Sequence, residues 1–219
     1  MKRILCYGDS NTWGHIPCAG TRYPENTRWT GVASERLGAG YTIVEEGLNG
    51  RTTTFDDYYV EYRNGRKGLG YALCAHAPID LIVVSLGTND LKYTNAVGSY
   101  KGLDELLRLI ENADANFPAA ISKIFPNGTK ILVVSPIHLH PDIATLRPES
   151  SIVDKYEEST KFAEYFRRIA DAHGAYFLDA SLYAKASVKD CVHMEEDSHR
   201  ALGIAIAAKV KEIFEGSAE

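Results

Sequence analysis

The chain has 219 residues, of which 45% are hydrophobic and 24% are charged, and its formal net charge at pH 7 is -5. These values are typical of globular proteins and exclude a disordered or fibrous chain. A chain of this size buries about 70% of its unfolded surface, which is enough for a core without disulfides or metals. With 29 acidic and 24 basic residues and no basic run, nucleic acid and anionic membranes are poor candidates as partners.

The cysteines and the apolar segments indicate the compartment. The four cysteines are too few for a disulfide scaffold and lack metal-ligand spacing; they are Cys6, Cys18, Cys74 and Cys191. Asp9 interrupts the first apolar run before a signal peptide could form. The most apolar stretch, 69–86, contains polar residues and does not suit a membrane span. We therefore expect a cytoplasmic protein with no membrane contact.

Short apolar runs alternate with helical patterns along the chain. Runs rich in Ile, Val and Leu predict strands at 3–7, 41–44, 81–85, 130–135 and 176–178. They lack polar alternation, as is typical of strands covered on both faces. Amphipathic spacing predicts helices at 29–37, 102–117, 151–173 and 197–214. The alternation predicts one α/β domain over residues 1–219, with a five-stranded parallel sheet and helices on both faces.

Polar residues follow the predicted strands where a ligand site is expected. In parallel α/β sheets, ligands bind at the carboxyl ends of the strands. Four segments would reach this rim, and they are 8–14, 47–53, 87–90 and 190–193. Together they bring Ser, Gly, Asn, Asp and His side chains or backbone groups to one edge of the sheet.

These residue types are sufficient for nucleophilic catalysis on an ester. Ser10 is the candidate nucleophile, His193 the base that takes its proton, and Asp190 the carboxylate that orients the base. The N–H groups of Ser10 and Gly50 and the side-chain amide of Asn89 are candidate donors to the oxyanion.

The order of these blocks resembles a known family. Gly8-Asp9-Ser10, Gly50, Gly87-Thr88-Asn89-Asp90 and Asp190-Cys191-Val192-His193 are similar to the four blocks of the SGNH (GDSL-type) hydrolase superfamily. Segments 45–53, 80–83 and 133–136 resemble its arylesterase/acyltransferase branch more narrowly.

The resemblance implies a flavodoxin-like three-layer α/β/α fold. It implies Ser10 as nucleophile, Asp190 and His193 as its partners, and an oxyanion hole formed by Ser10, Gly50 and Asn89. It also implies a small-molecule ester substrate, no metal and no organic cofactor. Relatives in this branch form oligomers, so the resemblance predicts a homo-oligomer, with an octamer as one form.

Some positions depart from the family pattern or stay open. Asn11 stands where the family name places Leu, and we expect this position to face packing rather than chemistry. Segments 21–28 and 55–67 match no family block and are expected to shape the acyl and alcohol pockets. Trp13 either lines the substrate pocket or packs against the first helix.

Other interpretations of the same residues remain. Asp9 or Ser10 could only cap a helix, and Glu196 with His199 repeats the spacing of the proposed acid–base pair. His138 and His140 suggest a metal, but no zinc motif accompanies them.

The leading hypothesis is a serine esterase that cleaves short-chain alkyl, aryl or acetyl esters through an acyl-enzyme and transfers acyl groups to alcohols. A carbohydrate acetylesterase is the close variant, and Trp13, Ile16, Tyr23 and Trp29 favour aryl or alkyl esters over sugars. A hypothesis of another class is a non-catalytic flavodoxin-like module that binds phosphate or a nucleotide through residues 8–14. Trp13 and Asp9 are unfavourable for that role, which also leaves Asp190 and His193 unexplained.

Overall fold

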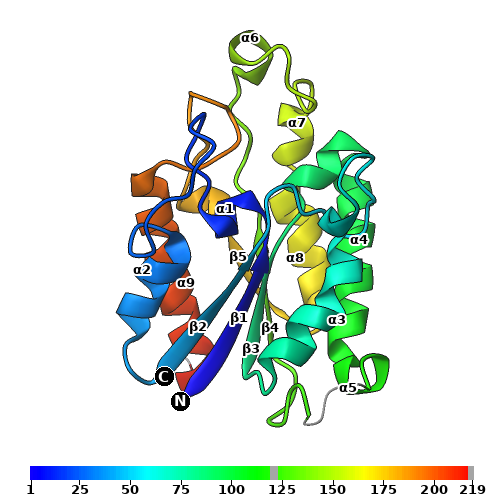
Figure 1. Cartoon of the computed structure of the whole chain (residues 1–219), viewed down its shortest axis with the longest axis vertical. Coiled ribbons are helices and arrows are strands. Elements are labelled where there is room, and N and C mark those ends of the chain that lie inside the picture. Colours follow the sequence, from blue (N-terminus) through cyan, green and yellow to red (C-terminus); the bar gives the residue numbers. More distant parts are fainter. Residues whose placement is uncertain (119–122, 217–219) are drawn as a thin grey trace.

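A computed structural model describes residues 1–118 and 123–216 of the chain. Five parallel strands form one sheet in the order β2-β1-β3-β4-β5. Their bounds are β1 Lys2–Gly8, β2 Tyr41–Gly47, β3 Leu81–Ser85, β4 Ile131–Ser135 and β5 Tyr176–Asp179. This strand order is that of flavodoxin-like folds. The predicted fold class, a three-layer α/β/α arrangement around a five-stranded parallel sheet, is confirmed (Figure 1).

Successive residues of each strand point to opposite faces of the sheet, so the core has two halves. On one face, Leu5 and Tyr7 of β1 belong to a cluster covered by α3 (Gly65–His76), α4 (Ala96–Glu111) and α8 (Phe162–Ala172). On the other, Ile4 and Cys6 belong to a cluster covered by α2 (Trp29–Leu37) and α9 (Glu196–Glu215). Figure 1 shows the two helical layers on either side of the strands.

Two of the predicted helices differ from the sequence prediction. The helix predicted at 102–117 begins at Ala96, because the Asn95 side chain caps it by accepting from Gly98 N–H at 3.0 Å, and it ends at Glu111 before a short α5 (Ala113–Asn116). The helix predicted at 151–173 is broken into α7 (Tyr156–Ser159) and α8.

A side-chain contact explains the break between α7 and α8. The Ser159 hydroxyl donates to Tyr156 O at 2.6 Å and accepts from Leu139 N–H at 3.0 Å, which ties α7 to the segment after β4.

Helix α3 was not predicted from the sequence, because its three glycines dilute the apolar pattern. One of them, Gly65, lies against the Thr52 and Thr53 carbonyls, where a Cβ would collide.

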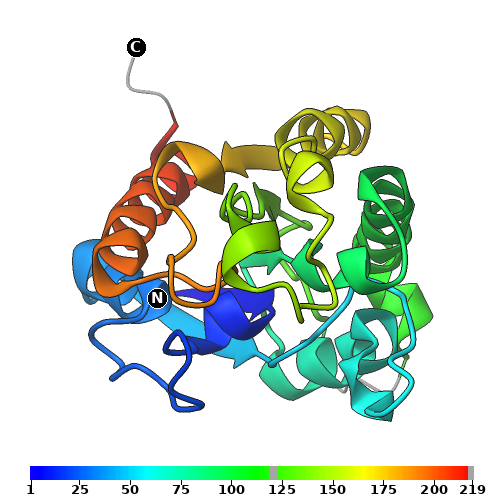
Figure 2. The same ribbon diagram turned by 90° about the horizontal axis from the view of Figure 1, so that it is seen from above.

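The strands end at the edge where the polar segments gather. β1 lies between β2 and β3, and Gly8 is in register with Gly47 on one side and Ser85 on the other. Seen from above this edge, the loop before α9 lies next to α1 (Ser10–Trp13), although the two are far apart in sequence (Figure 2). The remaining short elements are α6 (Ile143–Leu146) and the 3-10 turns η1 (Glu61–Arg63), η2 (Thr88–Lys92) and η3 (Ala180–Leu182). Among the described residues, no helix has the length and apolar character needed to cross a bilayer.

Candidate active site

Ser10 is the first residue of α1, directly after β1. Asp9 caps this turn, because its Oδ1 accepts a hydrogen bond from Asn11 N–H at 3.0 Å. Gly8 and Gly47 have no side chains to collide with α1, so the turn lies directly on the edge of the sheet. Asp9 therefore caps the helix as one interpretation expected, and the cap also fixes Ser10 at the rim.

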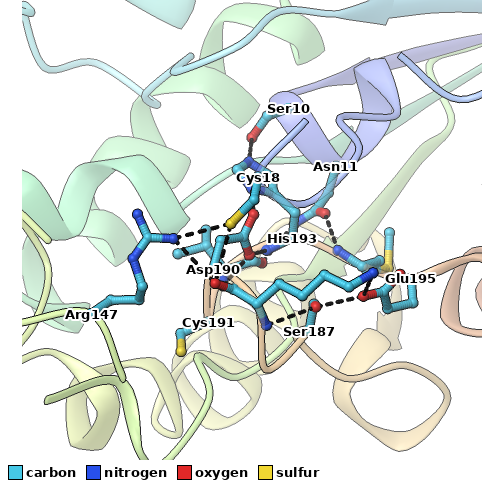
Figure 3. A network of polar contacts seen from close by, with 12 residues as sticks. Ser10, Asn11, Cys18, Arg147, Ser187, Asp190, Cys191, His193 and Glu195 are labelled. Atoms are coloured by element: carbon cyan, nitrogen blue, oxygen red, sulfur yellow. Dashed lines mark hydrogen bonds and ion pairs between the residues drawn. The ribbon is translucent and has the colours of Figure 1, made fainter. Parts of the chain in front are cut away.

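Ser10, His193 and Asp190 form a continuous chain of hydrogen bonds. His193 Nε2 lies 2.9 Å from Ser10 Oγ, and His193 Nδ1 lies 2.8 Å from Asp190 Oδ2 (Figure 3). Burial alone would raise the pKa of Asp190, but the hydrogen bonds and the charge of His193 and the N–H groups of His193 and Val192 outweigh it and lower the pKa to about 2. An ionised carboxylate only accepts hydrogen bonds, so His193 carries its hydrogen on Nδ1 and leaves Nε2 free to accept from Ser10.

The loop that carries Asp190 and His193 is closed on itself. Ser187 N–H donates to His193 O at 2.7 Å, and Cys191 N–H donates back to Ser187 O at 2.9 Å. Cys191 has a φ of 66°, which is unusual for a residue with a side chain, and its carbonyl accepts from His140 N–H at 2.9 Å. These hydrogen bonds within the loop and to His140 define its shape.

Side chains from two distant segments hold the outer edge of this loop. Arg147 Nη1 and Cys18 Sγ each lie 3.2 Å from Lys189 O. On the other side, the Ser187 hydroxyl donates to Glu195 Oε1 at 2.6 Å (Figure 3). These contacts anchor the Asp190 loop to the segment after α1 and to the start of α9.

Asn11 is bonded to this loop on both sides of His193. Its Oδ1 accepts from Met194 N–H at 3.1 Å, and its Nδ2 donates to Val192 O at 3.4 Å. The expectation that Asn11 faces packing is therefore wrong. A Leu here would have neither polar atom, so in this chain the residue after Ser10 fastens the Ser10 turn to the His193 loop.

Gly50 lies in a tight turn after β2. Arg51 N–H donates to Leu48 O at 3.1 Å, and Gly50 has a φ of 80°, a value that glycine adopts without strain. Arg51 fastens this turn to the end of β1, because its Nη1 donates to Gly8 O at 2.9 Å and also to Glu46 O. Burial lowers the pKa of the Arg51 guanidinium.

Asn89 belongs to η2, which follows β3. Its Nδ2 donates to Arg51 O at 3.2 Å and lies 3.5 Å from Asp9 Oδ2. Asn89 thus joins the Gly50 turn to the Ser10 turn. Of the five residues selected from the sequence, Ser10, His193 and Asp190 are joined by hydrogen bonds, and Asn89 bonds to Arg51, the neighbour of Gly50.

Buried acids lie beneath this arrangement. Asp90 accepts from Thr53 N–H and from the Thr53 hydroxyl, both at 2.8 Å, and it is fully buried. Burial raises the pKa of Asp90 to about 7 and the pKa of Asp9 to about 6. Asp90 and Thr53 were not selected from the sequence as contributors, although they stand within or beside the family blocks.

The comparison with known families agrees with this geometry. Residues 6–201 match the model of the GDSL-like lipase/acylhydrolase family. The chain belongs to this family. No curated protein sequence matches it.

Solved structures of family members are similar over almost the whole chain. A carbohydrate acetylesterase from Sinorhizobium meliloti is 33% identical with a TM-score of 0.89, and the match covers 98% of this chain and 100% of that one. The native aryl esterase of M. smegmatis is 32% identical with a TM-score of 0.88 and the same coverage. The predicted membership of the SGNH (GDSL-type) superfamily is confirmed, and the chain is a carboxylic ester hydrolase of this family.

The second candidate acid–base pair of this GDSL-like hydrolase does not form. Glu196 is exposed, whereas His199 is fully buried and accepts from Trp29 N–H at 3.3 Å through Nδ1. Burial lowers the pKa of His199 to about 4, with the charges of His193 and Arg28 acting in the same direction. His199 is therefore a neutral packing residue between α2 and α9.

One group of residues in the described part of the chain has the composition of a metal site. His15, Asp190 and His193 each offer a ligand atom within 4.8 Å of the others. The His15 and His193 rings are tilted by 35° to one another, with their centroids 4.2 Å apart. Both nitrogens of His193 are already hydrogen-bonded. This geometry favours proton transfer over metal binding.

The aromatic residues expected around the site differ in how far their side chains are exposed. Trp13 is half-buried, with the Arg22 guanidinium 5.4 Å from its ring centre. Tyr23 and Trp29 are 5% and 1% exposed, so they offer almost no surface to a bound alcohol, and Trp29 borders only a small cavity of about 20 Å³ beside Asp9 and Asn11. A cavity of about 520 Å³ lies on the far side of the Asp190 loop, between His140, Ser187 and Glu195, and the triad does not line it.

Proposed function

We propose that this GDSL-like hydrolase is a serine esterase in which Ser10 is the nucleophile, His193 the general base and Asp190 the residue that orients it. The observation that carries the proposal is the hydrogen-bonded chain from Ser10 Oγ through His193 to Asp190, at 2.9 and 2.8 Å. A phosphate-binding module would need no such chain, and Asp9 beside the same turn would oppose an anion.

The geometry supports a two-step reaction. Ser10 Oγ attacks the ester carbonyl carbon while His193 Nε2 takes the hydroxyl proton, and the carbonyl oxygen becomes an oxyanion. When the C–O bond of the ester breaks, His193 returns that proton to the departing alcohol, which leaves an acyl group on Ser10. Water activated by His193 then releases the acid, and an alcohol in place of water gives acyl transfer.

We assign the oxyanion hole to the N–H groups of Ser10 and Gly50 and the Asn89 amide. Among the described residues, nothing accepts a hydrogen bond from Gly50 N–H. The 3.5 Å contact from Asn89 Nδ2 to Asp9 is long, so that hydrogen is available to a stronger acceptor. Each such donor contributes roughly 3–4 kcal/mol of transition-state stabilisation.

The substrate we propose is an ester with a small acyl group, either an acetyl or another short-chain acyl group. Four residues favoured aryl or alkyl esters in the sequence. Two of them, Tyr23 and Trp29, are buried, which weakens that preference. A carbohydrate acetylesterase is therefore the second candidate, and two similar structures from S. meliloti are described as carbohydrate acetylesterases.

We also propose that the chain forms a homo-oligomer, with an octamer as one candidate form. Four tyrosines around η1 and α3 are 70–95% exposed and would suit a subunit contact, and they are Tyr58, Tyr59, Tyr62 and Tyr71. Light scattering after size exclusion tests this proposal, since a species of monomer mass would contradict it.

The function is tested by hydrolysis of p-nitrophenyl acetate and butyrate with wild type, Ser10→Ala and His193→Ala. We expect an active wild type and losses of about 10³-fold or more in kcat for each variant, because triad members act as a unit. Acetylated sugars assayed beside these esters decide between the two candidate alcohols. A Ser10→Ala protein as active as wild type would contradict the proposal.

A further inference from the structure

Arg63, at the end of η1, touches the peptide group that carries the Gly50 N–H. Its Nε donates to Asn49 O at 3.1 Å. Asn49 O and Gly50 N–H belong to the same peptide unit, and in a trans peptide they point in opposite directions. A hydrogen bond that fixes the carbonyl therefore fixes the direction of the N–H on the other side.

The type of turn decides which way this peptide faces. Residues 48–51 form a four-residue turn closed by Arg51 N–H to Leu48 O, and Gly50 at its third position has a φ of 80°. A φ near +80° there is the mark of a type II turn, whereas a type I turn has about -90°. The two types differ by a rotation of the central peptide of about 150° or more, with the ends of the turn unchanged. In the type I form, Gly50 N–H would point in nearly the opposite direction from the one it has here.

Arg63 is itself held firmly in place. Its Nη1 pairs with Asp57 Oδ2 at 2.9 Å, and the Tyr93 hydroxyl donates to the same oxygen at 3.0 Å. Its main chain is also fixed, since Thr52 N–H donates to Arg63 O at 2.9 Å. A guanidinium with two donors engaged at different partners has little freedom to leave the Asn49 carbonyl.

Arg63 also packs directly over Gly50. A Cβ on Gly50 would collide with the Nε, Cδ and Cζ atoms of Arg63. The guanidinium thus packs against the Gly50 Cα, while the Gly50 N–H has no hydrogen-bond acceptor among the described residues.

We propose that Arg63 is a positioning residue that keeps the turn at residues 48–51 in its type II form and so aims the Gly50 N–H at the oxyanion. The inference rests on the proposed oxyanion role of Gly50. It gives the segment 55–67 a function in catalysis, in addition to the pocket-shaping role expected from sequence.

The test is Arg63→Met, which keeps an unbranched side chain as far as the position of Nε and removes the donor. We expect kcat on p-nitrophenyl acetate to fall by about tenfold to a hundredfold with little change in KM, because only the transition state loses a donor. A matched thionoester should lose much less, since its sulfur accepts hydrogen bonds weakly and gains little from the hole. Arg66→Met is the control, because Arg66 pairs only with Glu105 at the surface among the described residues, and it should leave both rates unchanged.

Two further measurements test the role of Arg63 independently of the Arg63→Met kinetics. If Arg63→Met does not fold, Arg63→Lys keeps a charge beside Asp57, loses the Nε donor and should give the same ester-to-thionoester ratio. A crystal structure of the folded variant should show Gly50 at a negative φ in part or all of the molecules. Equal losses for ester and thionoester, or no loss with Gly50 still near +80°, would overturn the inference. An active Ser10→Ala protein would instead contradict the proposed function, and the φ of Gly50 would still decide the role of Arg63.

Discussion

The two halves of the site are built in different ways. The proposed proton relay, Asp190 and His193, lies on one short loop that local contacts close, such as Asp190 Oδ1 with His193 N–H at 2.9 Å, and that Asn11, Cys18 and Arg147 anchor from outside. The oxyanion half is assembled from β1, the turn after β2 and η2, and Arg51, Asn89 and Arg63 connect these segments.

This difference determines which kind of substitution should inactivate each half of the site. The relay needs two side chains in one loop, so a single change of charge abolishes its chemistry without moving the backbone. The oxyanion half needs a backbone N–H to point in one direction, so its function depends on residues that never touch the substrate. We expect changes in the first half to act through protonation and changes in the second to act through geometry.

Asp190→Asn should produce the largest effect. The amide cannot hold the Nδ1–H form of His193 by charge, and the corresponding change in a serine triad costs about 10⁴-fold in kcat. Because the pKa of Asp190 is about 2, wild type should keep this carboxylate ionised across all ordinary assay conditions. Steady-state kinetics with an unchanged circular dichroism spectrum would check this, and a loss below tenfold would contradict it.

Gly50→Ala should cost about 10² to 10³-fold in kcat, the value of one oxyanion donor. The new Cβ meets Arg63, and the φ of 80° is unfavourable for alanine. Gly38→Ala is a matched control, because Gly38 has a φ of 76° but no atom within 4 Å of its Cβ position. It should lower the melting temperature slightly and leave kcat unchanged, so equal kinetics for the two variants would contradict a role in the site.

Asn11→Leu should lower kcat about tenfold, because loss of alignment between Ser10 and His193 affects the rate more than binding. Asn11→Asp keeps the acceptor for Met194 N–H and loses the donor to Val192 O, so it should fall between Leu and wild type. If the Asp and Leu variants have the same rate, the hydrogen bond to Met194 is not what positions the loop.

Asp90→Asn should have the smallest effect on rate and a clear effect on stability. The pKa of Asp90 is about 7 when folded, above its ordinary value of 3.8, so folding takes up a proton between these values. The stability that protonation of Asp90 supplies is therefore fully present below about pH 4 and is lost as pH rises through 7. The free energies of unfolding of Asp90→Asn and wild type are compared by urea unfolding. Between pH 4 and pH 8, their difference should shift in favour of the variant by on the order of a few kcal/mol. A difference that does not change with pH would contradict the raised pKa, and Asp154→Asn at the surface is the control.

Sequence alone predicted the strands and singled out the five candidate site residues, because their signals are local. Apolar runs mark buried strands, and Ser10, Asp190 and His193 stand in recognisable blocks with a known chemistry. It did not predict the polar contacts that fix these residues. Asn11 was assigned to packing and Arg63 was part of an unmatched segment, because their partners, Met194 and Asn49, are identified only once the chain is folded.

The helices show the same limit of prediction from sequence. α3 was missed because its glycines are chosen for close approach, such as Gly65 against Thr52 O, and not for helix propensity. The break between α7 and α8 likewise depends on Ser159 binding Leu139 N–H, a contact between distant segments. Tertiary contacts overrode local pattern in both cases.

The central claim, that Ser10 carries the acyl group, is tested most directly by trapping the intermediate. Wild type mixed with p-nitrophenyl acetate and quenched in acid should carry the mass of one acetyl group on the peptide that contains Ser10. Asp190→Asn should accumulate it if deacylation is slowed more than acylation, and Ser10→Ala should carry none. An acetyl group on another residue, or an active wild type with no acetylated Ser10, would contradict the account.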